Sequence, residues 1–535
     1  MNNWRLVNSL YQIYPRSFFD TNQDGIGDIP GIIEKLDYLK GTDDSLGIDA
    51  IWISPFFPSP QADFGYDVSD YCDIDPQFGT LDDFETLLHE CHERHIKVML
   101  DYVPNHTSDQ HTWFKQARQS KDNKYREYYV WRDPKPDGSP PNNWISIFGG
   151  SAWTLDETTG QYYLHSFLSE QPDLNWENPE ARMAMLDVLR FWLDRGVDGF
   201  RADAVWHLSK DIQLRDEPKN PQHQGKHNEY GAHIHRYSKY GKNLFTYLRE
   251  MTDVVASYED RFIVFENYPD PTHGKVIDQY RAFYDINPVV SAPFNFEGMF
   301  VPWSAEAYAK YIRDFQDMIT PDDIPIFCFS NHDQTRVVNR FGREQARLIA
   351  MLQLTMPGMP TIYYGDEIGM EDGVILPEQI QDPSARDNEM GGRDPERTPM
   401  QWSSDLHAGF TRSTTPWLPV GETYTTYNVA DEQKHSDSFL SLYKQLLCLR
   451  SSDTTFRSND VVEVKVAKES ELLAYERVGD TATYRVILNF ADAPRNAYVS
   501  YTGNIILATH PDHIPQIDEH GEVTLAPFEG IIVRM

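Results

Sequence analysis

Three carboxylates in this sequence could act together, because each follows a short apolar run that is typical of a buried strand. Asp203 follows GFRA, Glu266 follows FIVF, and Asp333 follows IFCFSNH. A nucleophilic carboxylate and a protonated one beside a glycosidic bond are the usual equipment for cleaving that bond. Taken singly, each acid is better explained as a helix cap or as the partner of an arginine such as Arg201 or Arg336. The chemistry is favoured only if the fold brings the three acids together.

Eight strand-like runs alternate with helix-like runs, a pattern that predicts a parallel sheet with helices outside it. We expect an α/β fold, a (β/α)₈ TIM barrel, in which the C-terminal ends of the strands meet at one mouth and build the active site there. The expected strands are Leu10–Pro15, Ala50–Pro55, Lys97–Val103, Gly199–Val205, Arg261–Glu266, Phe283–Ile286, Pro325–Ser330 and Pro360–Tyr364.

Two of the helices between these strands can be predicted closely. Thr80 and Asp83 form a capping-box pattern ahead of apolar residues at helical spacing. The second helix has Asn178 as its cap and Gly196 as its terminator. That helix leads directly into the strand that ends at Asp203.

The distances between strands predict how the chain is divided. We expect the first part of the barrel at residues 1–103, an inserted subdomain at 104–173, and the second part of the barrel at 174–455. The inserted stretch is too long for a plain loop. A second irregular insertion is expected at 365–410, after the eighth strand. Short alternating segments such as VVEVKV and YRVILNF predict an antiparallel C-terminal β-domain at 456–535.

The composition excludes some partners. The chain has 48 basic and 82 acidic residues and a net charge of −34, which opposes binding to nucleic acid or to an anionic membrane. Adaptation to high salt is an alternative source of this charge. The sequence has no run of 18 apolar residues and no signal-peptide pattern at its start, so we expect a soluble, cytoplasmic protein. Its four cysteines show no CxxC spacing and are expected to be free.

Several longer motifs resemble those of one family. DYVPNH, GFRADAV, the strand before Glu266 and FSNHD are similar, in order, to four signature regions of the α-amylase superfamily, glycoside hydrolase family 13. QPDLNWENP resembles the region that marks its α-glucosidase and oligo-1,6-glucosidase branch, and YQIYPRSF, GMPTIYYGDEIGM and GRDPERTPMQW add support. The resemblance spans nearly the whole chain. One departure is Phe265, where the family usually has glycine before the acid; the acid itself is in place.

The resemblance implies a role for each acid. Asp203 would be the nucleophile, Glu266 the general acid/base, and Asp333 would hold sugar hydroxyls and help to distort the ring. Arg201 lies two positions before Asp203 on the same strand face and is expected to keep the pKa of Asp203 low. Nearby carboxylates are expected to raise the pKa of Glu266, so that it stays protonated near neutral pH.

The resemblance also implies a sugar-binding pocket. His106 and His332 would donate hydrogen bonds to glucose hydroxyls, although either could be structural. Asp63 and Tyr66 would bind the non-reducing glucose, and Arg397 would pair with Asp63 to close the pocket. Two aromatic residues of the inserted subdomain would either line the next subsite or belong to the subdomain core: Phe148 and Phe167.

The loop DTNQDGIGD at residues 20–28 is similar to the first part of an EF-hand. Its oxygen-bearing groups alternate along the loop: Asp20, Asn22, Asp24, the carbonyl of Ile26, and Asp28. The twelfth position is Gly31 and not glutamate, so no bidentate ligand completes the set. The resemblance implies a structural Ca²⁺ or Mg²⁺ here, with a metal-free turn as the alternative, and no organic cofactor is expected.

Taken together, these features predict a retaining exo-α-glucosidase that acts on small oligosaccharides or disaccharides. Ala204 resembles the residue found there in enzymes of this branch that prefer α-1,4 bonds, whereas valine is typical of α-1,6 preference. The enzymatic alternatives are a glucosyl transferase or isomerase of the trehalose synthase or sucrose isomerase type, and an oligo-1,6-glucosidase. A non-catalytic relative is disfavoured because all three acids are present. The oligomeric state is left open.

Overall fold

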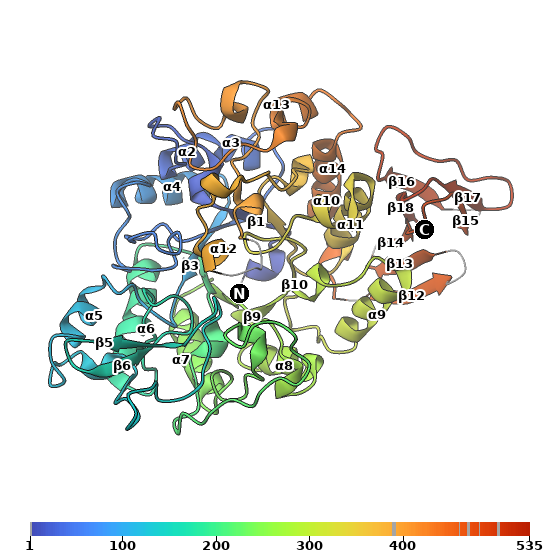
Figure 1. Ribbon diagram of the computed structural model, residues 1–535. Helices are drawn as coiled ribbons and strands as arrows, with labels where there is room; N and C mark the ends of the chain where they lie inside the picture. The colour runs from blue at the N-terminus through green and yellow to red at the C-terminus, as the bar shows by residue number, and fades with distance from the viewer. Residues whose placement is uncertain (1–2, 388–391, 460, 468–470, 481, 500–502) are drawn as a thin grey trace.

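The computed structural model describes residues 3–535 except 388–391, 460, 468–470, 481 and 500–502. Eight strands form one parallel sheet in the order β10-β9-β8-β7-β3-β2-β1-β11. A parallel bridge between Cys328, directly after β10, and Thr361 in β11 joins the two edges of the sheet. The sheet therefore closes into the expected barrel (Figure 1).

The strands of the barrel are short and almost completely buried. They are β1 Leu10–Ile13, β2 Ala50–Ile53, β3 Lys97–Tyr102, β7 Gly199–Ala202, β8 Phe262–Phe265, β9 Ser291–Asn295, β10 Ile326–Phe327 and β11 Thr361–Tyr363. Because helices cover the outside and side chains fill the inside, these runs are mostly apolar. The polar exceptions include Gln12, Asp101 and Arg201, which are buried as well. Seven of the eight predicted strands are confirmed to within a few residues.

The sixth predicted strand is wrong. Residues 283 and 284 are the last two of helix α8, Val276–Tyr284, and residues 285 and 286 follow it. The sixth strand is β9, Ser291–Asn295. The helix buries residues at the spacing of three and four that marks a helical face: Tyr280, Phe283 and Tyr284. Pro293 disguised the true strand, because proline has no N–H for a strand ladder and argues against a central strand.

Helices surround the barrel (Figure 1). They are α1 Pro15–Phe18, α2 Ile29–Glu34, α3 Leu36–Leu39, α4 Leu81–Glu93, α5 Thr112–Ala117, α6 Pro179–Asp194, α7 Leu244–Ala256, α8 Val276–Tyr284, α9 Ala305–Gln316, α10 Val337–Phe341, α11 Arg343–Thr355, α12 Pro383–Asp387, α13 Val429–Glu432 and α14 Phe439–Ser452. The capping box of Thr80 and Asp83 starts α4 as predicted. The side chain of Asn178 caps α6 by accepting hydrogen bonds from the N–H groups of Glu180 and Ala181.

The long connection between β3 and β7 forms a small unit of its own. Its antiparallel sheet has the order β4-β6-β5 and consists of β4 Trp131–Arg132, β5 Trp153–Asp156 and β6 Gln161–Leu164. A separate core lies beneath this sheet: Trp144, Ala152, Trp153 and Leu164. An irregular segment at residues 207–243, which the sequence analysis did not anticipate, is bound to this unit; Nε1 of Trp144 donates to the carbonyl of Arg215 at 2.9 Å.

After α14 the chain forms antiparallel sheets, as predicted for the C-terminal part. One sheet has the order β12-β13-β14-β18-β16, and β15 pairs with β17. The strands are β12 Val461–Ala467, β13 Leu472–Val478, β14 Thr483–Asn489, β15 Arg495–Tyr498, β16 Asn504–Ala508, β17 Glu522–Leu525 and β18 Gly530–Arg534. Figure 1 shows them beside α9 and α11, on the opposite side of the barrel from β5 and β6.

Two expectations from composition can be compared with the fold. All four cysteines are free; Cys91 and Cys328 are buried, Cys72 is half-buried, and Cys448 is exposed. Within the described part of the chain, none of the helices is both long and apolar enough to cross a membrane.

Candidate active site

A cavity of about 330 Å³ lies where the barrel strands end. Nine of the predicted site residues line it: Asp63, Tyr66, His106, Phe148, Phe167, Asp203, Glu266, His332 and Asp333. The other two predicted binding residues, Arg201 and Arg397, are completely buried and contact acids of the lining. The barrel therefore brings the three candidate acids to one mouth, although more than a hundred residues separate the first from the last.

Backbone pairing places Asp203 and Glu266 at adjacent strand ends. The N–H of Asp203 donates to the carbonyl of Tyr102 at 2.8 Å, and the N–H of Glu266 donates to the carbonyl of Ala202 at 2.9 Å. Directly after Asp203, Ala204 adopts a left-handed conformation with φ 47° and ψ 33°. Its N–H donates to Oε2 of Glu266 at 2.6 Å. This turn links the two acids through one backbone hydrogen bond.

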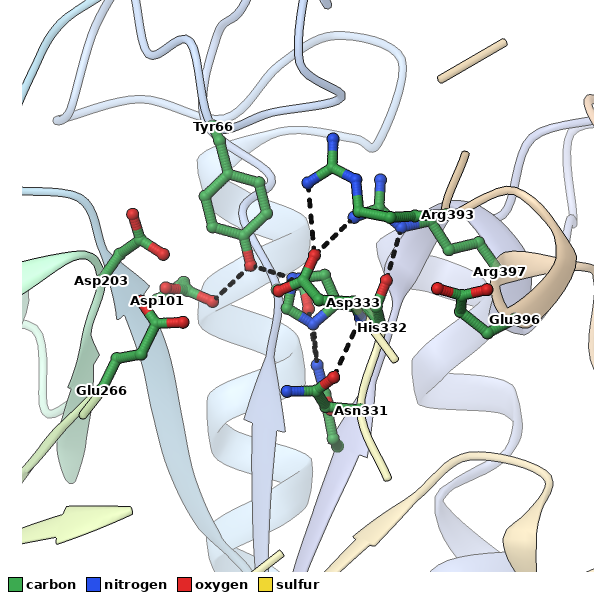
Figure 2. Close-up of polar contacts among 12 residues, drawn as sticks. Tyr66, Asp101, Asp203, Glu266, Asn331, His332, Asp333, Arg393, Glu396 and Arg397 are labelled. Atoms are coloured by element: carbon green, nitrogen blue, oxygen red, sulfur yellow. Dashed lines mark hydrogen bonds and ion pairs between the residues drawn. The ribbon is translucent and has the colours of Figure 1, made fainter. Parts of the chain in front are cut away.

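The guanidinium of Arg201 contacts three carboxylates. Nη1 of Arg201 lies 2.8 Å from Oδ1 of Asp101 and 2.5 Å from Oδ1 of Asp203, and its Nη2 lies 2.8 Å from Oε1 of Glu266. Figure 2 shows these three carboxylates grouped on one side of the Tyr66 ring. A single positive charge does not balance three buried negative charges, so the cluster favours a proton on one of the acids.

Burial raises the pKa of both catalytic candidates in this cluster, Glu266 and Asp203. It raises the pKa of Glu266 well above its usual value; Arg201 opposes this rise, and the negative charges of Asp203 and Asp333 add to it. Burial also raises the pKa of Asp203, to about 6, against the effect of Arg201. The prediction that Arg201 holds the pKa of Asp203 low is therefore wrong, because a guanidinium shared by three acids does not offset the burial. Burial and the neighbouring negative charges therefore favour the proton on Glu266, and Asp203 is the acid that ionises more readily.

Two arginines hold Asp333. Nη2 of Arg397 lies 2.8 Å from Oδ1 of Asp333, and Nη1 of Arg393 lies 3.2 Å from the same oxygen (Figure 2). Burial raises the pKa of Asp333, but His332 and the two arginines outweigh it, so the pKa lies well below the usual value. Asp333 is therefore an ionised acceptor at the cavity wall.

The predicted pair of Arg397 and Asp63 is wrong. Nη2 of Arg393 lies 2.6 Å from Oδ1 of Asp63 and 2.9 Å from Oδ1 of Asp382, whereas Arg397 pairs with Asp333. Both arginines belong to the motif GRDPERTPMQW, four residues apart. The motif was recognised correctly, but only the path of the folded loop shows which of its arginines reaches Asp63.

The two predicted histidines are neutral and lie near Asp63. Burial lowers the pKa of both His106 and His332. Nε2 of His106 lies 3.1 Å from the carbonyl oxygen of Tyr66 and 3.1 Å from Nε2 of Gln171. The Gln171 amide also donates to Oδ2 of Asp63 at 3.1 Å. Nε2 of His332 lies 2.6 Å from the hydroxyl of Tyr66, so both imidazoles are held by polar contacts.

Phe148 and Phe167 lie at the cavity and outside the core of the inserted unit. Both are half-buried, and their ring centroids are 6.0 Å apart. The guanidinium of Arg393 lies over the Phe148 ring at 5.3 Å, and the Phe167 ring lies 5.1 Å from that of His106. Of the two alternatives for these residues, the structure shows the cavity-lining one.

Several residues of this site were not predicted from the sequence. Asp101 shares Arg201, and its position at a strand end within DYVPNH was a signal that could have revealed it. Four more residues that line the cavity were not predicted: Trp206, Tyr230, Lys239 and Tyr268. Tyr230 and Lys239 come from the irregular segment at residues 207–243, whose sequence has no pattern that indicates a place at the barrel mouth.

The predicted metal loop is held by its own hydrogen bonds. Asp20 accepts from the N–H of Gln23 at 2.7 Å, and Asp28 caps α2 by accepting from the N–H of Gly31 at 2.7 Å. Among the described residues, no group of three or more His, Cys, Asp or Glu side chains is placed to hold a metal ion. The predicted set also includes the Asn22 side chain and the carbonyl of Ile26, and the structural Ca²⁺ or Mg²⁺ stays a prediction.

Chelation tests the predicted ion. If the loop binds Ca²⁺ or Mg²⁺ in solution, EDTA is expected to lower Tm with little change in the initial rate far below Tm, because an ion that binds only the folded state stabilises it. Calorimetry in EDTA, and again after Ca²⁺ is restored, measures the effect. The matched variant Asp24→Asn keeps an oxygen at an exposed position of the loop and is expected to be less sensitive to EDTA. Equal Tm values with EDTA and with Ca²⁺ would contradict the prediction.

Comparisons with known proteins agree with this fold and site. The sequence model described as "Alpha amylase, catalytic domain" matches residues 12–459. The oligo-1,6-glucosidase of Heyndrickxia coagulans is 40% identical over 92% of this chain and 93% of that protein. The α-glucosidase of Apis mellifera is 39% identical over 90% of this chain and 84% of that protein. The crystal structure of an α-glucosyl transfer enzyme has a TM-score of 0.91 and 35% identity, and covers 100% of this chain and 99% of that one.

These similarities extend through the barrel and include every strand end that supplies a candidate acid. The barrel of this chain is therefore one of a known architecture. The chain belongs to the α-amylase family, glycoside hydrolase family 13, and is a glycoside hydrolase enzyme.

Proposed function

We propose that this protein is a retaining exo-α-glucosidase that releases glucose from the non-reducing end of short α-glucosides, with α-1,4 bonds preferred. The observation that carries the proposal is the pair of acids at the cavity, Asp203 and Glu266, which are bound by one guanidinium and whose surroundings favour the proton on Glu266. A two-step displacement at an anomeric carbon needs such a pair. Relatives named oligo-1,6-glucosidase and α-glucosidase support it.

In the proposed reaction, the carboxylate of Asp203 attacks the anomeric carbon of the terminal glucose. Glu266 gives its proton to the glycosidic oxygen as the bond to the leaving sugar breaks. Water then attacks the anomeric carbon of the glucosyl ester, Glu266 takes a proton from that water, and the bond to Asp203 breaks. Each step inverts the configuration at the carbon, so the overall reaction retains it.

The arrangement at Asp63 supports the release of one glucose at a time. Arg393 bridges Asp63, Asp333 and Asp382, and Arg393, Asp63 and Asp333 line the cavity. We infer that these salt bridges close the cavity where a longer chain would need to continue. Asp333 and the imidazole of His332 can bind the hydroxyls of a terminal glucose there. We infer that a single glucose unit lies on this side of the bond that is cleaved.

The products formed from maltotriose test this function. We expect α-glucose as the first-formed anomer, released from the non-reducing end with maltose as co-product, and ¹H NMR during the first minutes of reaction measures both. Labelling the reducing end shows which end loses glucose. First-formed β-glucose would contradict retention, and the splitting of maltotetraose into two maltose units would contradict exo action.

A glucosyl transferase is a second candidate, favoured by the aromatic residues that line the cavity. The faces of Trp206, Tyr230 and Tyr268 offer surfaces on which an acceptor sugar could pack, and one similar structure is that of an α-glucosyl transfer enzyme. Increasing maltose concentration separates the two activities. Hydrolysis gives two glucose molecules per maltose at every concentration, whereas transfer gives less free glucose and new oligosaccharides. Products from sucrose would likewise reveal an isomerase.

The pH profile is predicted from the pKa values of the two acids. The carboxyl group of Asp203 has a pKa of about 6, and Asp203 must be ionised to attack, so kcat/KM is expected to fall about tenfold for each pH unit below 6. Glu266 must be protonated, so activity is expected to fall again above its raised pKa. Initial rates between pH 4 and pH 10 measure both limbs. The variant Glu266→Gln is expected to lose the alkaline limb, and its persistence would show that another group causes it.

The predicted preference for α-1,4 bonds rests on Ala204, which lines the cavity directly after Asp203. The parent is expected to have a higher kcat/KM for maltose than for isomaltose, and Ala204→Val is expected to lower that ratio by about 10- to 200-fold, as small changes in pocket shape do. Ala204 has a left-handed backbone conformation in which a β-branched residue is strained. Ala204→Gly, which tolerates that conformation, is the control. A parent that prefers isomaltose, or an unchanged ratio in Ala204→Val, would contradict the linkage argument.

A further inference from the structure

Gln12, in β1, lies beneath the site and has no part in the proposed mechanism. Its side chain is completely buried, with Nε2 placed 2.8 Å from Nδ1 of His332 and 3.3 Å from Oγ of Ser54. Within the described residues, Oε1 of Gln12 has no hydrogen-bond partner. In the opposite orientation of the Gln12 amide, its two N–H donors would be buried without a partner, whereas the present orientation leaves only one acceptor unpaired. The opposite orientation therefore costs more free energy. Gln12 therefore donates to Nδ1 of His332.

Contacts on the other side of the imidazole lead to the same assignment. The hydroxyl of Tyr66 lies 2.6 Å from Nε2 of His332 and 3.1 Å from Oδ2 of Asp101 (Figure 2). Asp101 also accepts from Nε1 of Trp52 at 3.0 Å and from Arg201 at 2.8 Å. Burial raises the pKa of Asp101, but Arg201 and these hydrogen bonds favour its ionised form. Tyr66 therefore gives its one proton to Asp101, and its oxygen accepts the Nε2–H of His332.

We propose that Gln12 is a positioning residue that fixes His332 in the tautomer with its proton on Nε2. A neutral imidazole has only one N–H. Because Gln12 donates to Nδ1, the proton of His332 must be on Nε2, which lies beside Tyr66. The hydrogen bonds then run in one direction, from Gln12 through His332 and Tyr66 to Asp101. Asp101 shares its guanidinium partner with the two proposed catalytic acids. The inference rests on the proposed glucosidase function, because these hydrogen bonds lead to the acids that the function makes catalytic.

The charged groups around His332 agree with a neutral ring. Burial lowers the pKa of His332 well below its usual value. Asp333, whose Oδ2 lies 3.4 Å from Nε2, opposes this lowering. Three neighbouring arginines lower the pKa further: Arg397, Arg201 and Arg393. The ring of Tyr14 stacks on the imidazole with centroids 5.9 Å apart, and the ring of Trp52 meets it edge-on at 6.0 Å. Replacing the amide of Gln12 with a carboxylate would add a negative charge at Nδ1 and raise the pKa of His332.

Two substitutions at this position separate donation from packing. Gln12→Met fills a similar volume without a donor, and kcat/KM for maltose is expected to fall about 10- to 100-fold at every pH. Gln12→Glu can only accept from Nδ1. At a pH below the raised pKa of His332 in this variant, the imidazolium still donates from Nε2 to Tyr66, so activity is kept. At a pH above that pKa, the remaining proton lies on Nδ1 and is donated to Glu at position 12, so activity is lost. The Gln12→Glu variant should therefore lose activity as the pH rises through the raised pKa of His332, a pH dependence that Gln12→Met does not have.

Ser54→Ala is the matched control, because it removes the other hydrogen bond of Gln12 and leaves His332 untouched; parental kinetics are expected. ¹⁵N NMR of histidine-labelled protein, with His332 assigned by His332→Asn, reads the tautomer directly. Three results would overturn the proposal. The parent protein could have the proton of His332 on Nδ1, or both Gln12 variants could have parental kinetics. The third is an equal loss of activity in both variants with the same pH profile. A parent that shows the Nε2–H form but no glucosidase activity would instead remove the proposed function. If Gln12→Glu does not fold, Gln12→Met and the parent spectrum decide.

Discussion

Replacing Asp203 with alanine is expected to lower kcat on maltose by about 10⁴-fold or more, as the loss of a catalytic nucleophile does. The physical reason is that no other group in the proposed reaction can form the glucosyl ester. The fold should persist, because Arg201 keeps Asp101 and Glu266 as partners and the cluster loses one of its excess negative charges. Steady-state kinetics, circular dichroism and Tm measure both parts. A folded variant with near-parental rates would contradict the assignment of Asp203.

Azide distinguishes a lost nucleophile from a damaged site. Alanine leaves space where the Asp203 carboxylate was, and a small anion can attack the anomeric carbon from that side. With an activated aryl α-glucoside and Asp203→Ala, we expect azide to restore turnover and to give β-glucosyl azide. Azide should not affect the parent in this way. Recovery without that product, or with the α-azide, would show that Asp203 does not occupy the attacking side.

Replacing Glu266 with glutamine is expected to lower kcat/KM on maltose by about 10²- to 10⁴-fold, the usual contribution of general acid–base catalysis. The amide keeps the size of the carboxyl group and an oxygen that can accept the N–H of Ala204, which bonds Oε2 at 2.6 Å in the parent. It has no proton of suitable acidity to give to the leaving sugar. The comparison is made at the pH optimum of the parent, with Tm as the check on folding.

The leaving group provides the control for Glu266. An aryl glucoside whose phenol leaves readily needs little protonation, so formation of the ester from it should be far less affected by Glu266→Gln than formation from maltose. A burst of phenol is then expected, because the ester is hydrolysed slowly without the base. Equal losses for both substrates, without a burst, would place Glu266 outside the acid/base role.

Much of the barrel could be predicted because its signals are local. Each correct strand is a short apolar run, and the polar residues that follow mark its C-terminal end. The run at residues 283–286 was misleading for the same reason: it is apolar, but its neighbours in the sequence extend a helical face. A sequence segment that began at Val276 would have shown the helical spacing. The strand Ser291–Asn295 could not be predicted from residue propensities, because Pro293 argues against a central strand.

The pKa prediction for Asp203 shows where local reasoning ends. The sequence places Arg201 two residues before Asp203, which correctly indicates contact, at 2.5 Å. It does not indicate that Asp101 and Glu266 share the same guanidinium, or that all of these groups are buried. Because burial acts on the charged form of every acid in the cluster, it determines the direction of the pKa change, and burial is a property of the assembled fold.

The sequence by itself determined the barrel, the order of its motifs and the three acids at its strand ends, because short apolar runs and the polar residues that end them are encoded by neighbouring residues. The tertiary structure alone decided that Arg393 and not Arg397 pairs with Asp63, and that Tyr230 and Lys239 line the cavity. Those residues lie on irregular segments, whose paths are set by long-range contacts such as the hydrogen bond from Trp144 to Arg215. No periodic pattern records such contacts, since each joins residues that are distant in the chain.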